Sequence, residues 1–107
     1  MPFPEIRELF EDDIDALVQF SSVLQRELRQ AADQLSNALP RGDARTVGDL
    51  KHKLRTSLNL LEAEALRTEL VQATDTLRAG GSVDPNHQQS IVGRLRDYAT
   101  RLQQERW

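Results

Sequence analysis

Hydrophobic residues recur every three or four positions along most of the chain, and this spacing predicts helices. No segment alternates apolar and polar residues with a period of two, which is the pattern of a half-buried strand. Each long segment therefore carries one apolar stripe of an amphipathic helix, and the chain is expected to be all-α. The longest stripe consists of Ile14, Leu17, Ser21, Leu24, Leu28, Ala31, Leu35 and Ala38.

Capping and turn residues divide this pattern into one short and four long helices. Asp12 or Asp13 can cap the second helix, which Pro40 and Gly42 end. Asp43 is then a suitable cap for the third helix, which contains the first of the two histidines. The expected helices span residues 5–10, 14–39, 44–61, 66–77 and 85–102.

The later boundaries differ in the strength of their signals. Neither Pro nor Gly separates the third helix from the fourth, so a tight turn near residues 61–62 is inferred from the break in the phase of the stripe. Two glycines at residues 80–81 end the fourth helix. Ser82 or Asp84, followed by Pro85, supplies a cap and a first-turn proline for the fifth.

The connections between these helices are short, and a short connection between long helices implies antiparallel neighbours. The sequence therefore predicts an antiparallel four-helix bundle with up-down-up-down topology. The short helix at residues 5–10 is expected to cover one end of it. A chain of 107 residues has enough side chains for one modest core, so residues 1–107 are expected to form a single domain.

Composition narrows the classes of partner and compartment. Hydrophobic residues make up 38% and charged residues 29% of the chain, and the formal net charge of -3 gives no reason to expect nucleic acid. The absence of cysteine excludes disulfides and thiolate metal sites. Acidic residues crowd the first fifteen positions, unlike a signal peptide, and no apolar run approaches the length of a membrane span. A cytoplasmic protein without membrane insertion is expected.

The third helix presents a histidine on its polar side. At about 100° per residue, His52 lies opposite the middle of the apolar stripe, so its imidazole is expected to point into water. The stripe itself consists of Val47, Leu50, Leu54, Leu58 and Leu61. The neighbours of His52 on the polar side are Gly48, Asp49, Arg55 and Thr56 within one turn, and Asn59 two turns along.

Few other chemistries fit the chain. The only other histidine, His87, is thirty-five residues away among polar residues, and no metal-ligand spacing accompanies either histidine. The two glycines at residues 80–81 lack the strand and lysine of a phosphate-binding loop. A Ser-His-Asp arrangement has no pocket to occupy in such a bundle. Nucleophilic chemistry at His52 is the hypothesis that remains after these other chemistries are set aside.

The segment His52-Lys53-Leu54-Arg55-Thr56-Ser57 resembles the signature of histidine-containing phosphotransfer (HPt) domains. That signature reads His, any residue, Leu, Lys, Gly and a small residue. His52, Leu54 and Ser57 match it, and Arg55 stands where the family has Lys. Leu61, Ala63 and Leu66 also fall where the family often has an apolar residue, Ala and Leu.

Three positions qualify this resemblance. Thr56 occupies the place of the signature glycine, one turn after His52, where its side chain is expected to crowd the docking of a partner. Glu62 replaces a second frequent glycine. Gly48 lies one turn before His52. A glycine within a helix lowers its stability by about 1 kcal/mol relative to Ala, so this residue needs an explanation. It is interpreted either as clearance beside the imidazole or as a tolerated surface glycine.

The resemblance implies a phosphoryl carrier rather than an independent enzyme. In the family the histidine relays a phosphoryl group between the aspartates of receiver domains, so the expected partners are a response-regulator receiver or a hybrid sensor kinase. The imidazole of His52 would accept the group at Nε2, and Arg55 would stabilise its charge. No cofactor is expected, since the Mg²⁺ would come with the receiver. The expected binding residues are Gly48, Lys53, Thr56, Asn59 and Thr74.

Two assignments follow from the same comparison. By its offset from the histidine, Thr74, with Gln72 close by, is the candidate to hold Nδ1–H of His52. The apolar residues Phe10, Ile14 and Leu17 could form a docking surface, or they could belong to the core and lid. Three functions stay open: a working phosphotransfer module, an HPt-like module that binds a receiver or kinase without efficient transfer, and a structural helical adaptor.

Overall fold

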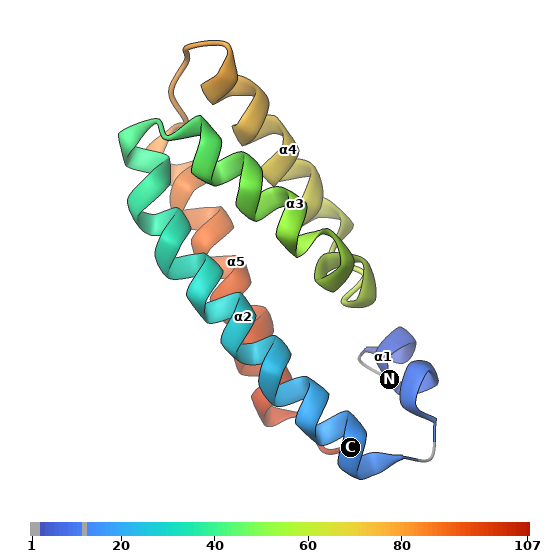
Figure 1. Ribbon diagram of the computed structural model, residues 1–107. Coiled ribbons are helices and arrows are strands. Elements are labelled where there is room, and N and C mark those ends of the chain that lie inside the picture. Colours follow the sequence, from blue (N-terminus) through green and yellow to red (C-terminus); the bar gives the residue numbers. More distant parts are fainter. Residues whose placement is uncertain (1–2, 12) are drawn as a thin grey trace.

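The computed structural model describes residues 3–11 and 13–107, and these residues form five α-helices without a strand. The prediction of an all-α chain is confirmed. Figure 1 shows the four long helices gathered around a common interior, with the short first helix beside them. The helices are α1 (Pro4–Phe10), α2 (Ile14–Arg41), α3 (Ala44–Leu60), α4 (Glu64–Arg78) and α5 (Pro85–Gln104).

The helix ends follow the capping residues closely. Asp13 accepts a hydrogen bond from the backbone N–H of Ala16 at 3.1 Å and so caps α2; Asp12, the other predicted cap, lies outside the described residues. Helix α2 runs two residues past the predicted end near residue 39, because Pro40 does not stop it and is accommodated in its last turn. The prediction of Gly42 as a terminator is confirmed, since this glycine, with φ of 66°, ends the helix.

The predicted turn between α3 and α4 lies where the phase of the stripe breaks. The backbone N–H of Glu62 donates to the carbonyl of Asn59 at 3.0 Å, and that of Ala63 donates to the carbonyl of Leu58 at 2.9 Å. Glu62 adopts φ of 55° to make this reversal. That left-handed conformation is the one for which glycine is favoured after a helix.

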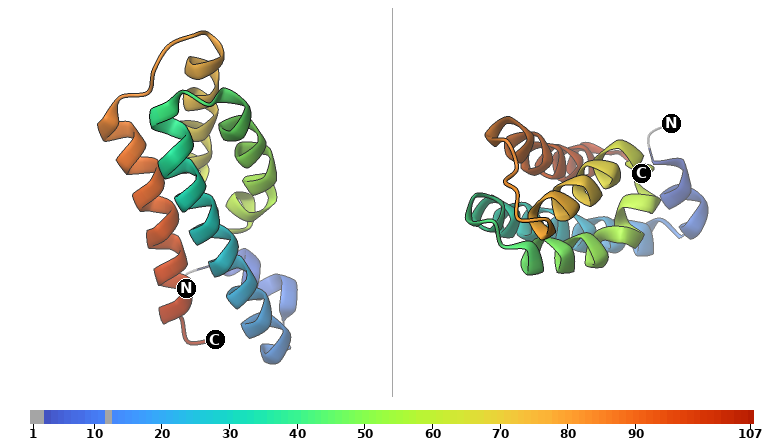
Figure 2. Two further views of the ribbon diagram at one scale, coloured as in Figure 1. Left: turned by 60° about the vertical axis from the view of Figure 1, so that its left-hand side comes forward. Right: turned by 90° about the horizontal axis from the view of Figure 1, so that it is seen from above.

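The longest helices, α2 and α5, lie side by side and run in opposite directions (Figures 1 and 2). Arg29 donates to Gln103 at 3.1 Å, and Asp33 pairs with Arg96 at 3.0 Å, so numbers rise along one helix as they fall along the other. α3 packs on α2 and α4. The interior between these helices is filled mainly by leucines, of which Leu28, Leu35, Leu54, Leu70 and Leu95 are fully buried.

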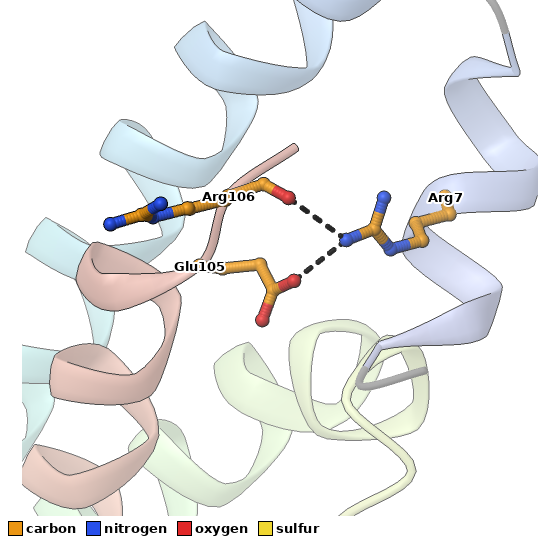
Figure 3. A network of polar contacts seen from close by, with 3 residues as sticks. All are labelled: Arg7, Glu105 and Arg106. Carbon is orange, nitrogen blue, oxygen red and sulfur yellow. Dashed lines mark hydrogen bonds and ion pairs between the residues drawn. The ribbon is translucent and has the colours of Figure 1, made fainter.

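The short helix α1 is fastened to the C-terminal end of the chain. Arg7 donates through Nη2 to Glu105 at 2.6 Å and to the carbonyl of Arg106 at 3.2 Å (Figure 3). The guanidinium also lies 4.9 Å from the centre of the Trp107 ring. Ile6 of the same helix is fully buried. Within the described ranges, no helix combines the length and apolar character that a membrane span requires.

Candidate functional site

His52 lies at the midpoint of α3, with eight helical residues on either side. Its side chain is exposed, whereas Val47, Leu54 and Leu58 on the opposite side of the helix are buried. The prediction that the imidazole faces water is confirmed. Among residues 3–11 and 13–107, no protein hydrogen bond or ion pair engages the imidazole. Both ring nitrogens are therefore accessible to a partner.

The start of α3 is fixed by a compact cap. Asp43 accepts from the backbone N–H of Thr46 at 3.1 Å and from its hydroxyl at 2.7 Å. The bond from the Thr46 hydroxyl is the main reason that the pKa of Asp43 lies below its ordinary value, and the nearby charge of Arg41 acts in the same direction. The helix that carries His52 is thus anchored at its first turn.

Arg55 is exposed three residues after His52, close to it on the helix surface. No ion pair in the described part of the chain joins Arg55 to Asp49 or Glu62. Lys53 points to the other side of α3, where it lines a groove of about 430 Å³ against α2. Arg55 is therefore an exposed cation that α3 places one turn after the imidazole.

Gly48 is buried, and this overturns its interpretation as a surface glycine. A Cβ atom at Gly48 would lie 2.8 Å from Nη2 and 3.7 Å from Cζ of Arg78. The position is not a solvated surface glycine, because the guanidinium of Arg78 on α4 occupies the space. Clearance beside the imidazole stays a prediction. The sequence signalled a close approach through a glycine within a helix, but it did not identify Arg78.

Thr74 is fully buried, and its hydroxyl is engaged within its own helix. Thr74 Oγ1 donates to the carbonyl of Leu70 at 2.8 Å, while its methyl group faces the backbone of Gly48. Neither Thr74 nor the exposed Gln72 hydrogen-bonds to His52 among the described residues. Their role in holding Nδ1–H stays a prediction.

The two remaining predicted binding residues lie on the exposed side of α3. Thr56 is exposed one turn after His52. Asn59 is exposed as well, and its side-chain oxygen accepts from Nη1 of Arg67 at 2.8 Å. Asn59 therefore links α3 to α4, which gives it a structural partner that the sequence did not indicate.

The apolar residues proposed for docking do not gather beside His52. Leu17 is buried in the core, and Phe10 packs on Phe20 with ring centres 5.0 Å apart. Ile14 is 45% exposed, but it lines a groove that α2 forms with the end of α5. The core and lid interpretation is confirmed for Leu17 and Phe10.

Val71 is an exposed apolar residue on the edge of α4 that borders α3. It shares a stripe of α4 with Arg67, which contacts Asn59, and with Arg78, which covers Gly48. Its side chain is 39% exposed. The border of α3 and α4 thus combines cations with one accessible apolar group.

Comparisons with known proteins identify no relative. No protein-family model matches the chain, and no curated protein or solved structure matches it either. Within residues 3–11 and 13–107, no three His, Cys, Asp or Glu side chains are grouped as metal ligands.

Proposed function

We propose that the chain is an HPt-type phosphotransfer module in which His52 carries a phosphoryl group between the aspartates of receiver domains. One observation carries this proposal: an exposed imidazole without a protein partner at the midpoint of a helix whose far side is buried. A histidine placed for packing would be buried, and one placed for structural hydrogen bonding would have a partner.

The proposal includes a finer description of the fold as an antiparallel bundle of four helices with up-down-up-down topology. The opposed directions of α2 and α5 support it, as does the tight turn that joins α3 to α4. Such a bundle displays the middle of α3 on a rigid support. A partner could then approach His52 without displacing any other segment.

The proposed step is an in-line displacement at phosphorus. The lone pair of Nε2 on the neutral imidazole forms the N–P bond as the P–O bond to the receiver aspartate breaks, and the bonding electrons leave with the carboxylate. The proton on Nδ1 stays in place, so the ring carries positive charge until that proton is lost. Return transfer to a second receiver reverses these changes.

The charge of α3 suits an acidic partner. The helix carries Arg45, Lys51, Lys53 and Arg55 against the single carboxylate of Asp49, although the whole chain has a net charge of -3. Receiver domains hold their phosphoryl group in an acidic pocket with Mg²⁺, so the magnesium would belong to the partner. Opposite potentials of this kind accelerate encounter and orient the two surfaces. Such a relay operates in the cytoplasm.

The second candidate is an HPt-like module that docks on a receiver or kinase but transfers poorly. It is favoured by Thr56, whose side chain occupies the exposed surface one turn from His52, where a glycine would leave space. In this case the electrostatic attraction would persist while the imidazole failed to reach phosphorus. A structural adaptor, the third candidate, would need neither the exposed histidine nor the cations around it.

The test is transfer from receiver domains that have been phosphorylated with radiolabelled acetyl phosphate. Acid-labile, base-stable label should appear on the protein and should be lost in His52→Gln but kept in His87→Gln, whose histidine is also exposed. Binding without transfer would favour the docking module. Neither binding nor transfer across the receivers of the source genome would leave only the adaptor.

Arg55→Ala separates the role of the guanidinium from that of the fold. We expect the variant to retain its helicity, because Arg55 is exposed and unpaired in the described structure. The phosphohistidine should hydrolyse faster by about tenfold, the effect of losing one charge-assisted hydrogen bond. An unchanged lifetime would reduce Arg55 to a solvated surface charge.

A further inference from the structure

A cation from α4 reaches the surface of α3 at one backbone position. The guanidinium of Arg78 lies against Gly48, where a Cβ atom would be 2.8 Å from Nη2 and therefore in collision with it. Gly48 is the residue of α3 that allows this approach, since any other residue would place a carbon atom there. Glycine destabilises a helix interior, and the contact with Arg78 explains why α3 has a glycine at position 48.

This position brings the guanidinium close to the candidate phosphoryl acceptor. Gly48 and His52 are four residues apart on one helix. The Cβ atom of His52 and the place that a Cβ atom would take at Gly48 are therefore neighbours, about 5–6 Å apart. Helical Cα–Cβ bonds tilt toward the N-terminus, and side chains cover the preceding turn. A side chain at the position of His52 is thus expected to cover the turn that contains Gly48, which is the turn that the guanidinium of Arg78 contacts.

The charge of Arg78 is available at this position. Arg78 is exposed, and no ion pair of the described residues includes it. Arg55 lies on the turn of α3 that follows His52, whereas the guanidinium of Arg78 lies against Gly48 on the turn that precedes it. Two guanidinium groups thus belong to the two turns of α3 that flank His52.

We infer that Arg78 is a second phosphate-binding residue of the site, and that Gly48 is glycine so that this guanidinium can reach the group carried by His52. The inference rests on the proposed phosphotransfer function. It assigns the oxygens of the phosphoryl group to two arginines, one on α3 and one on α4. The N–P bond and the proton on Nδ1 are as described above, and Arg78 donates hydrogen bonds without exchanging a proton.

Gly48→Ala tests this arrangement without removing any functional group. The added methyl group must displace the guanidinium, which is the far end of a flexible side chain, whereas its distance of 3.5 Å from Thr74 Cγ2 is an ordinary contact. Alanine also favours helix more than glycine does. We expect equal or higher thermal stability together with a phosphohistidine that hydrolyses about tenfold faster.

The companion variants are Arg78→Ala and the double variant Gly48→Ala/Arg78→Ala. Each should shorten the phosphohistidine lifetime. In the double variant the lifetime should be no shorter than in Arg78→Ala alone, because both changes remove the same contact. Arg96→Ala removes an exposed guanidinium from the far helix α5 and should leave the lifetime unchanged. Additive losses in the double variant would contradict the coupling of Gly48 to Arg78.

Phosphoramidate serves as the phosphoryl donor, and phosphorus NMR follows the product. A guanidinium beside the phosphoryl group favours its dianion, so the pH midpoint of the phosphorus shift should rise in Gly48→Ala and in Arg78→Ala. Stability effects alone would not move this midpoint. If His52 of the wild type carries phosphate but neither variant changes the midpoint or the lifetime, the inference fails alone. If His52 is not phosphorylated by phosphoramidate or by receivers, the proposed function fails.

Discussion

Thr56 lies one turn after His52 on the exposed side of α3, and its side chain shares the surface that a receiver must cover. In Thr56→Gly the approach to the imidazole should be less crowded, and the rate of transfer from a phosphorylated receiver should rise about threefold. The helix should lose about 0.5 kcal/mol of stability, because glycine is a poorer helix former than threonine. Rapid-quench measurement of transfer gives the rate.

Thr56→Ala is the matched control for bulk without added backbone freedom. An intermediate increase in rate is expected, since alanine keeps Cβ but removes the hydroxyl and methyl groups. Equal or lower rates in both variants would show that Thr56 does not hinder docking. The altered signature residue would then have no consequence for transfer.

The exposure of His52 could be predicted because the period of a helix fixes which residues face away from its apolar stripe. The contact between Gly48 and Arg78 could not be predicted in the same way. It depends on which turn of α4 lies beside which turn of α3, and a stripe of leucines allows several such registers. The burial of Thr74 was missed for the same reason, although its predicted place on the fourth helix is confirmed.

Glu62, in the turn between α3 and α4, has an unfavourable backbone conformation that lowers stability. It adopts φ of 55°, a conformation that disfavours residues with a Cβ atom. Glu62→Gly should therefore raise the free energy of unfolding by about 0.5–1 kcal/mol, after allowance for the greater freedom of glycine in the unfolded chain. Urea denaturation measures the change as a higher midpoint at constant slope.

Glu62→Ala separates the backbone effect from the charge. Alanine keeps the Cβ atom and removes the carboxylate, so it should give no comparable stabilisation. A gain in Glu62→Ala equal to that in Glu62→Gly would assign the effect to charge, and the strain interpretation of the turn would be wrong.

Asp43 makes the stability of α3 depend on pH. Its pKa is lowered in the folded state from an ordinary value of 3.8, chiefly by the hydrogen bond from the Thr46 hydroxyl. The contribution of the carboxylate is therefore complete above the unfolded value and is lost as the pH falls through the lower folded value. The stability difference between wild type and Asp43→Asn should be largest above about pH 4 and should shrink below it.

Denaturation of both proteins between pH 5 and pH 2 gives this difference directly. Asp49→Asn is the control, because this exposed carboxylate on the same helix makes no hydrogen bond among the described residues. A difference for Asp43→Asn that stays constant over the range would show that the cap does not depend on ionisation.

The ends of the helices were predicted well where a cap or a glycine marks them, as at Asp43 and Gly42. They were predicted less well at Pro40, because a proline in the last turn loses only one backbone hydrogen bond and can be tolerated there. The turn between α3 and α4 was placed correctly from the phase of the apolar residues alone. The strained backbone of Glu62 in this turn could not be predicted from the sequence, since φ depends on the conformation of the whole turn.

The molecule as a whole is a rod, with principal extents of 48 × 20 × 17 Å. One end is held together by α1 and the C-terminal residues, where Arg7 lies over Trp107 and the rings of Phe3 and Trp107 are 6.2 Å apart. The period of the apolar residues predicted the helices themselves. It could not predict this fastening, because it joins residues a hundred positions apart by contacts between single side chains.

Trp107→Ala should loosen that end of the rod. The loss of a cation–π contact and an aromatic pair should lower the free energy of unfolding by about 1–2 kcal/mol. Hydrogen exchange should accelerate in α1 more than in α3, because only α1 depends on this contact. Arg106→Ala, which keeps the carbonyl that Arg7 binds, should have little effect. Equal acceleration in both helices would show that α1 is not fastened independently.

The pairing of Phe3 with Trp107 has a practical consequence for assembling this protein into larger molecules. A fluorophore, surface anchor or second protein joined near either of these residues would emerge from the same pole of the rod, while His52 occupies the middle of α3. Either attachment leaves the imidazole free to meet a binding partner in solution, so the direction of fusion can be chosen for convenience.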